Sequence, residues 1–119
     1  MKRRGDNTLS HRRLLMALAI QVLKANKQFA TGAAIAHVIA DYTDGNYPQI
    51  NGSVYGIMRG MWDRGWALPW VEVDRFGAEF KTWDLTPAGR QALKRTLDEF
   101  DALRAAAEGK AIVRMAKAA

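Results

Sequence analysis

The segment from Asn51 to Arg90 constrains the fold more than any other part of this chain. It begins with a run in which apolar residues recur at helical spacing, continues through two short runs rich in β-branched and aromatic residues, and ends in the phrase WDLTPAGRQAL. Within that phrase Thr86 suits a helix N-cap and Pro87 suits the first helical position. The segment therefore predicts a helix, a two-stranded ribbon and a capped helix, in that order.

The first run predicts a helix with one buried face, because its apolar residues stand at positions i, i+3, i+4 and i+7. These residues are Val54, Ile57, Met58 and Met61. Asn51 is the expected N-cap of this helix, and Gly65 is expected to end it. The opposite face is expected to be exposed, and it carries Gly52, Tyr55, Gly56, Arg59 and Asp63.

The ribbon is predicted from Leu68 to Val73 and from Phe80 to Leu85, because these runs are rich in β-branched and aromatic residues. The six residues 74–79 between them would form the tip of a hairpin.

Two further helices are expected before this segment. Ser10 can cap the first, which ends near Lys27, and Thr31 can cap the second, which closes before the turn-rich stretch 43–48. The last helix should run from Pro87 to about Glu108. Three helices, a β-hairpin and a closing helix make an α+β chain with the order of elements of a winged helix-turn-helix domain.

On this interpretation the chain has three parts. Residues 1–9 form a flexible basic arm, residues 10–87 form a winged helix-turn-helix DNA-binding domain, and residues 88–119 form a C-terminal dimerisation helix with its tail. Beyond Leu93 the last helix carries an apolar stripe that the small body cannot cover, so we expect a second copy of the chain to bury it. The stripe consists of Leu97, Phe100 and Leu103.

Composition excludes several classes of protein. With 119 residues the chain forms one domain, and because it has no cysteine it has neither disulfides nor thiolate chemistry. Its longest apolar run, Leu14–Ile20, is far shorter than the ~20 residues that cross a bilayer, so we expect a cytoplasmic protein without membrane contact. The sequence has no Gly-rich phosphate loop and no catalytic spacing of side chains, so neither enzymatic activity nor a cofactor is expected.

The net charge of +6 suits a polyanionic partner, but the charge is unevenly distributed. Residues 1–40 carry seven basic side chains against one acidic, whereas residues 41–87 carry four basic against seven acidic. The segment expected to contact DNA is therefore acidic in sum. The basic run of the arm is equally well explained as a solvated surface.

The exposed face of the helix after Asn51 carries the side chains expected to contact double-stranded DNA. Arg59 can donate two hydrogen bonds to a guanine edge, while Ser53 and Tyr55 can donate to phosphate near the start of the helix. The remaining expected DNA contacts are Arg3, Arg4, Asn51, Arg75 and Lys81.

Two glycines on this helix require an explanation, because Gly56 and Gly60 each cost about 1 kcal/mol relative to alanine inside a helix. Close approach of a DNA backbone or of another helix would explain both. For Gly60 the alternative is relief of crowding beside Trp62 or Trp66.

The stretch from Ile50 to Leu93 resembles the PadR-like family of bacterial winged-helix transcriptional regulators. The matching phrases are INGSVYGIMRGMWDRGW and FKTWDLTPAGRQAL. The resemblance implies a homodimer joined through the C-terminal helix, with paired recognition helices on a palindromic operator, acting as a repressor. Two features depart from the family: Gly56 stands where relatives often carry proline or a larger residue, and the wing tip has Arg75 as its sole cation, with acidic neighbours on either side.

Alternative sites stay open at this point. His37 and Asp41 stand four residues apart and could supply two metal ligands, but two are too few for a closed site, so a helix-end pair is the simpler interpretation. The tryptophans could line a pocket for a small aromatic effector, as in dimers of this family that resemble drug sensors. Packing of the wing and core is the better explanation for three of them, namely Trp66, Trp70 and Trp83, because they stand on or beside the two strands. The role of Trp62 stays open.

One alternative function also stays open. A winged-helix protein with an acidic recognition region could bind a protein partner through its recognition-helix face, as a phage-encoded accessory factor would. The acidic balance of residues 41–87 and the two helix-face glycines favour this interpretation, whereas the basic arm and Arg59 favour DNA.

Overall fold

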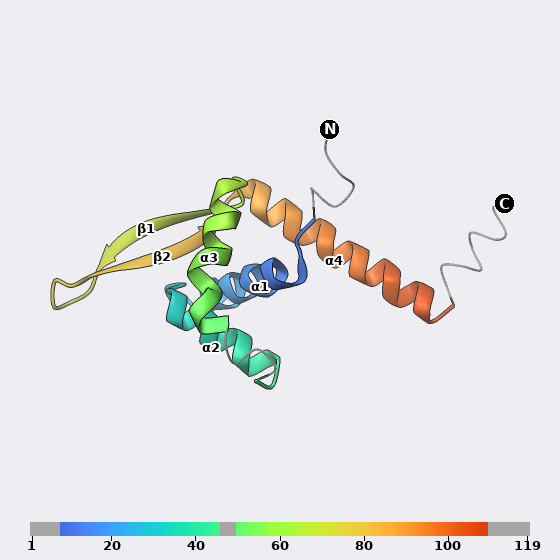
Figure 1. The fold of residues 1–119 in the computed structure, drawn as a ribbon, viewed down its shortest axis with the longest axis horizontal. Coiled ribbons are helices and arrows are strands. Elements are labelled where there is room, and N and C mark those ends of the chain that lie inside the picture. Colours follow the sequence, from blue (N-terminus) through green and yellow to red (C-terminus); the bar gives the residue numbers. More distant parts are fainter. Residues whose placement is uncertain (1–7, 46–49, 110–119) are drawn as a thin grey trace.

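The computed structural model describes residues 8–45 and 50–109, and of residues 50–52 it describes the backbone alone. Figure 1 shows a helical body, a long hairpin that projects from it on one side, and a further helix that leaves it on the other. The elements are α1 (His11–Ala25), α2 (Gly32–Tyr42), α3 (Ile50–Asp63), β1 (Ala67–Val73), β2 (Glu79–Leu85) and α4 (Pro87–Ala107). This order confirms the predicted α+β arrangement.

Three of the predicted helix caps are present. Ser10 Oγ accepts from Arg13 N–H at the start of α1, and Thr31 Oγ1 accepts from Ala34 N–H at the start of α2. At the start of α4, Thr86 Oγ1 accepts from the third helical residue, and proline occupies the first position. Each bond satisfies a backbone donor that the first helical turn leaves free.

The prediction that Asn51 caps α3 is wrong, because the helix already begins at Ile50 and Asn51 lies inside its first turn. Asparagine is tolerated there, so its presence alone does not mark the start of a helix. The other end matches the expectation. Gly65 has a φ of 76°, Trp66 N–H donates to Met61 O over 2.9 Å, and the helix closes in a Schellman motif.

β1 and β2 pair in antiparallel register from Ala67 opposite Leu85 to Val73 opposite Glu79. The tip contains five residues, 74–78, rather than the predicted six, because Glu79 already pairs. Asp74 Oδ1 accepts from two backbone N–H groups of the tip, those of Phe76 at 2.8 Å and Ala78 at 2.9 Å. The Asp74 side chain therefore holds the turn.

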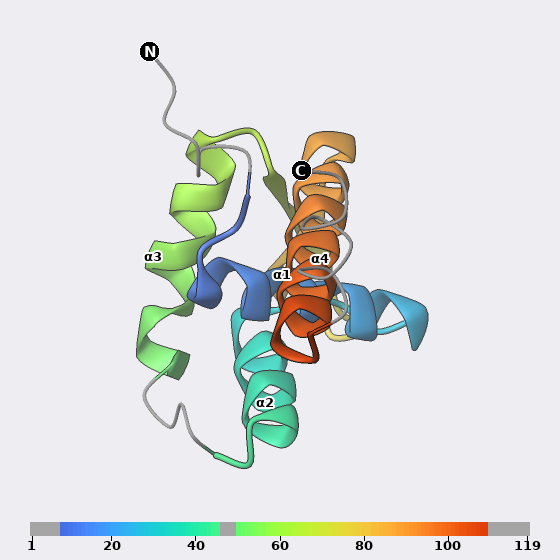
Figure 2. The ribbon, with the colours of Figure 1, turned by 90° about the vertical axis from the view of Figure 1, so that its right-hand side faces the viewer.

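The core lies where α1, α2 and α3 meet, as Figure 2 shows from the side. Its fully buried large side chains include Met16, Ile20, Ile35, Ile39, Met58 and Met61. The predicted inner face of α3 is confirmed, with Ile57 only partly buried at its edge. Trp66, just before β1, and Trp83 on β2 are buried against the core, as their interpretation as packing residues requires, whereas Trp70 stays 39% exposed.

Gly89 allows α4 to join this body. A Cβ atom at Gly89 would lie 2.0 Å from the Trp66 carbonyl oxygen, so no larger residue fits. That same oxygen accepts from Thr86 N–H over 3.0 Å, and Thr86 Oγ1 donates to Gly65 O over 2.6 Å. The glycine of the phrase LTPAGR is therefore required by the contact between the start of α4 and the end of α3.

Past its first turns α4 leaves the body. Leu93 is buried, and Thr96 is held by Leu9, whose N–H donates to Thr96 Oγ1 over 2.8 Å. Leu9 is itself 7% exposed, so this residue at the end of the predicted arm packs as part of the fold. The stripe beyond is exposed, as predicted: Leu97 to 38%, Phe100 to 46% and Leu103 to 57%.

Candidate nucleic-acid interface

The outer face of α3 is exposed as the helical pattern predicts. Tyr55, Gly56, Arg59 and Asp63 are all accessible, while Ser53 is half-buried. The side chain of Asn51 lies outside the description, and so does the exposure of Gly52. One helix face therefore presents a phenol, a guanidinium and, between them in sequence, a glycine.

A groove runs along Gly56, where the first turn of α1 faces α3. Its volume is about 380 Å³, and it is lined by Ser10, Arg12, Arg13, Gly56 and Ile57. Among the described residues, no atom from outside this stretch of α3 lies within 4 Å of a Cβ built on Gly56, so no packing contact shown there requires glycine. Figure 2 shows the start of α1 beside α3. The groove combines two arginines with the N-terminal end of a helix, whose dipole is positive, and this is a favourable environment for an anion.

Arg13 crosses α3 at the second glycine. Its Nη2 atom lies 3.3 Å from the position of a Cβ on Gly60, so the crowding at Gly60 comes from Arg13 rather than from Trp62 or Trp66. The Arg13 guanidinium lies 6.0 Å from the centroid of the Trp66 ring, and that of Arg64 lies 5.1 Å from it. Burial, followed by the nearby charge of Arg64, lowers the pKa of Arg13.

The pKa of Arg13 is lowered mainly because the guanidinium is partly buried, and to a smaller extent because Arg64 is near. An arginine ordinarily titrates so far above neutrality that Arg13 stays charged at physiological pH. Among the described residues, no carboxylate forms an ion pair with Arg12, Arg13 or Arg59. Binding of a polyanion would reduce the repulsion between Arg13 and Arg64.

Lys81 flanks the other side of the α3 face. Its Nζ atom lies 5.0 Å from the centroid of the Tyr55 ring and 6.0 Å from that of Trp83. Trp83 in turn meets Trp62 edge to face, with ring centroids 6.3 Å apart. Two predicted site residues, Tyr55 on α3 and Lys81 on β2, are thus brought together.

The hairpin tip is a separate surface, far from α3 in Figure 1. The Arg75 guanidinium lies 4.9 Å from the centroid of the Phe76 ring, and Phe76 is 82% exposed. Because the Asp74 carboxylate accepts two backbone N–H groups, its charge is directed into the turn. Arg3 and Arg4 lie outside the described residues.

The acidic balance of residues 41–87 does not produce an acidic face on α3. Glu72 Oε1 accepts from Trp70 Nε1 over 2.7 Å, and Asp84 Oδ2 pairs with Lys24 Nζ over 2.5 Å. His37 Nε2 and Asp41 Oδ2 lie 3.6 Å apart, and both side chains are exposed on the outer face of α2, as expected for a helix-end pair. Of the seven carboxylates in this region, Asp63 is the one on the outer face of α3.

Sequence reasoning missed Arg12 and Arg13 as members of this site, because it counted them only in the basic N-terminal third of the chain. The one signal that points to them is Gly56, an unexplained glycine on an exposed helix face.

Within the described ranges, no three metal-ligating side chains gather in one place. The described helices also include none with the length and apolar character of a membrane span.

The three-helix body, the projecting hairpin and the exposed third helix define an α+β fold of the winged-helix type. Among solved structures it is similar to TA0346 from Thermoplasma acidophilum, a candidate transcriptional regulator. The TM-score is 0.52 and the sequence identity 25%, over 92% of this chain and 99% of the other. Neither a protein-family model nor a curated protein matches the chain, so membership of the PadR-like family stays a prediction.

Proposed function

We propose that this protein is a DNA-binding transcriptional regulator that binds a palindromic operator as a homodimer and acts as a repressor. The observation that carries the proposal is the set of cations around the outer face of α3. They are Arg12 and Arg13 on one side, Arg59 on the face itself and Lys81 on the other side. The similarity to a candidate transcriptional regulator supports the same class.

In the proposed complex α3 enters the major groove. Arg59 reaches a base edge, where a guanidinium can donate to both acceptors of guanine. A phosphate of the flanking strand occupies the groove at Gly56, where it meets Arg12, Arg13 and the start of α1. Tyr55 and Lys81 contact the phosphate backbone on the other side, with Ser53, Asn51 and the arm residues Arg3 and Arg4 as further contacts.

The proposed dimer forms through the exposed stripe of α4. Leu97, Phe100 and Leu103 are exposed on α4, the helix that extends from the body in Figure 1. Burying these three large apolar side chains against a two-fold mate would remove them from water. A two-fold dimer presents two copies of α3, which requires a palindromic site. Repression then follows from occupancy of that operator, which excludes other proteins from the same DNA.

Selection from a random DNA pool tests the proposal. The full chain is incubated with random-sequence duplexes at low salt, and bound DNA is recovered, amplified and sequenced. We expect a palindromic consensus. Recovery of DNA without any consensus would contradict sequence-specific regulation, and failure to bind DNA at low salt would contradict the proposed class.

A protein partner is the second candidate, because apolar side chains are also exposed on this side of the molecule. Tyr55 is 53% and Trp62 41% exposed on α3, and Val71 is 56% exposed on the hairpin. The affinity of a protein complex would depend weakly on salt, whereas the affinity of a DNA complex would fall steeply as salt rises.

A small aromatic effector is also part of the proposal, since Trp70 lies half-exposed at the edge of a cavity.

A further inference from the structure

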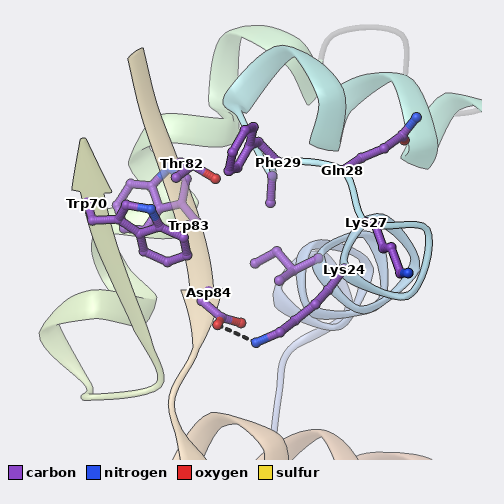
Figure 3. Close-up of a pocket in the computed structure, with 10 residues that line it drawn as sticks. Lys24, Lys27, Gln28, Phe29, Trp70, Thr82, Trp83 and Asp84 are labelled. Atoms are coloured by element: carbon purple, nitrogen blue, oxygen red, sulfur yellow. Dashed lines mark hydrogen bonds and ion pairs between the residues drawn. The ribbon is translucent and has the colours of Figure 1, made fainter. Parts of the chain in front are cut away.

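A cavity of about 330 Å³ lies where the root of the hairpin meets the end of α1. Figure 3 shows that its lining comes from three parts of the chain: α1, the segment between α1 and α2, and both strands. All of them belong to one subunit. The possibility left open from the sequence was a tryptophan-lined pocket in a dimer, whereas this cavity is formed within one chain.

The walls of the cavity are rings. Trp70 and Trp83 lie on the strand side and Phe29 lies opposite (Figure 3). The Trp70 indole is held in place because its Nε1 donates to Glu72 over 2.7 Å, and Phe29 meets Phe80 edge to face at 5.3 Å. Fixed ring surfaces on both sides favour a flat, apolar ligand.

One polar atom in the wall has no partner. Thr82 is fully buried, and its Oγ1 has no hydrogen-bond partner among the described residues. Thr82 stands directly opposite Trp70 in the strand register, and Figure 3 shows it on the side of the cavity beside Phe29. A buried hydroxyl without a partner destabilises the protein unless another molecule satisfies it.

The rim of the cavity is positive. Lys24 Nζ pairs with Asp84 Oδ2 over 2.5 Å, which neutralises one ammonium. Lys27 lines the same cavity and forms no ion pair within the described part of the chain. Lys27 thus keeps its positive charge at the edge of the cavity. In Figure 3 its ammonium points away from Trp70 and Trp83, so the flexible side chain would turn inward to meet an anionic group on the ligand.

We propose that this cavity binds a fused-ring aromatic anion. The rings would lie between Trp70 and Phe29, the anionic group would face Lys27, and a polar ring substituent or the same group would reach Thr82. The cavity of about 330 Å³ has room for two fused rings, which would contact Trp70 and Phe29 over a larger area than a single ring.

The position of the cavity suggests how such a ligand would act, and this part rests on the proposed function. The backbone N–H of Trp83 donates to the Ala30 carbonyl oxygen at 3.0 Å, so a hydrogen bond attaches the hairpin to the helical body beside the cavity. On the opposite face of the same strand Lys81 meets Tyr55. A ligand between Trp70 and Phe29 would fix the angle of the hairpin and thereby change how β2 and α3 present their cations to DNA.

Calorimetric titration of the full chain with naphthalene-2-carboxylate tests the site without DNA. We expect one saturable site per chain, weaker binding of benzoate and of the neutral naphthalene-2-carboxamide, and the weakest binding of 2-naphthylmethylammonium. Trp70→Ala and Lys27→Gln should each weaken the carboxylate about tenfold, corresponding to ~1.4 kcal/mol. Val71→Ala and Arg104→Gln, on the other face of the hairpin and on α4, are matched controls and should leave binding unchanged.

Thr82→Val distinguishes a ligand contact from a purely structural hydroxyl. It should raise the melting temperature of the free protein, because an unsatisfied buried group is removed, and it should weaken the carboxylate. A higher melting temperature with unchanged affinity would show that Thr82 does not contact the ligand.

Several results would overturn the proposal. The first is the absence of saturable binding, and the second is equal affinity for the carboxylate and the ammonium compound. The third is loss of binding in Leu97→Ala but not in Trp70→Ala, because that result would place the ligand on the α4 stripe. A gel shift with and without naphthalene-2-carboxylate then tests the regulatory part alone. If the chain binds the carboxylate but never DNA, the proposed function fails and the ligand site stands.

Discussion

The ammonium nitrogen of Lys81 lies 5.0 Å from the centroid of the Tyr55 ring, which joins the second strand of the hairpin to the outer face of α3. At an exposed position such a contact contributes about 0.5–1 kcal/mol. It therefore fixes the relative position of two side chains more than it stabilises the fold. Both groups face the surface that we propose to bind DNA, so the hairpin and the helix act as one unit there.

We expect binding to random duplex DNA to weaken steeply as salt rises from about 50 to 200 mM, because each neutralised phosphate releases counterions. Arg12→Gln should reduce the slope of log K against log salt by about 1 without changing the preferred sequence. Removal of residues 1–4 should flatten the slope similarly. Arg104→Gln on distant α4 is the matched control. If it reduces the slope as much as Arg12→Gln does, the slope reflects the overall charge of the protein and not a contact at Arg12.

Arg59→Ala should weaken operator binding by about 1–3 kcal/mol and relax the preference at one base pair, as expected for the loss of a bidentate contact. Tyr55→Phe should weaken all duplexes alike, since it removes a phosphate contact. Competition binding against a panel of single-base operator variants measures both effects. If Arg59→Ala has no effect while Arg75→Ala abolishes recognition, the hairpin tip reads the sequence instead.

Gly56→Ala should stabilise the free protein by about 1 kcal/mol, because alanine is the better helix former and the added Cβ meets no atom within 4 Å. The same methyl group would narrow the groove beside Arg12 and Arg13, so DNA binding should weaken. Denaturant unfolding and a gel shift on one preparation check the two effects. Unchanged DNA affinity would show that no phosphate enters this groove.

Gly89→Ala should destabilise the protein by about 3 kcal/mol, the upper end of the range for overpacked sites, because its Cβ would collide with the Trp66 carbonyl at 2.0 Å. The Gly56→Ala variant is the control, since it makes the same change within a helix where space is free. Urea unfolding compares them. Equal stability of the two variants would contradict the close contact between α4 and the end of α3.

Leu97→Asp combined with Phe100→Asp should yield a folded monomer that binds the operator far more weakly, because the two half-sites are no longer held together. The unaltered chain should sediment as a dimer at micromolar concentration and protect half-sites whose centres are about 34 Å apart. Asp98→Asn on the same helix is the control. A monomeric unaltered chain with high operator affinity would mean that DNA induces the dimer.

The positions of the helices and strands follow from the sequence by itself, because local bonds determine them. Ser10, Thr31 and Thr86 each satisfy a donor three residues ahead, and Gly65 ends α3 within the same turn. The exposed stripe of α4 also follows from periodicity. Asn51 shows the limit of such reasoning, because a residue that suits a cap is also accepted inside the first helical turn.

Tertiary structure alone decided which distant residues share a surface. Arg13 lies beside Gly60 and Lys24 beside Asp84, although some forty-seven and sixty residues separate them. Summing charge over a segment could not reveal this, because a side chain's electrostatic neighbours are set by packing and not by position along the chain. Packing likewise placed the unpartnered Thr82 hydroxyl in a cavity wall, and it made Gly89 the one residue that fits against the Trp66 carbonyl.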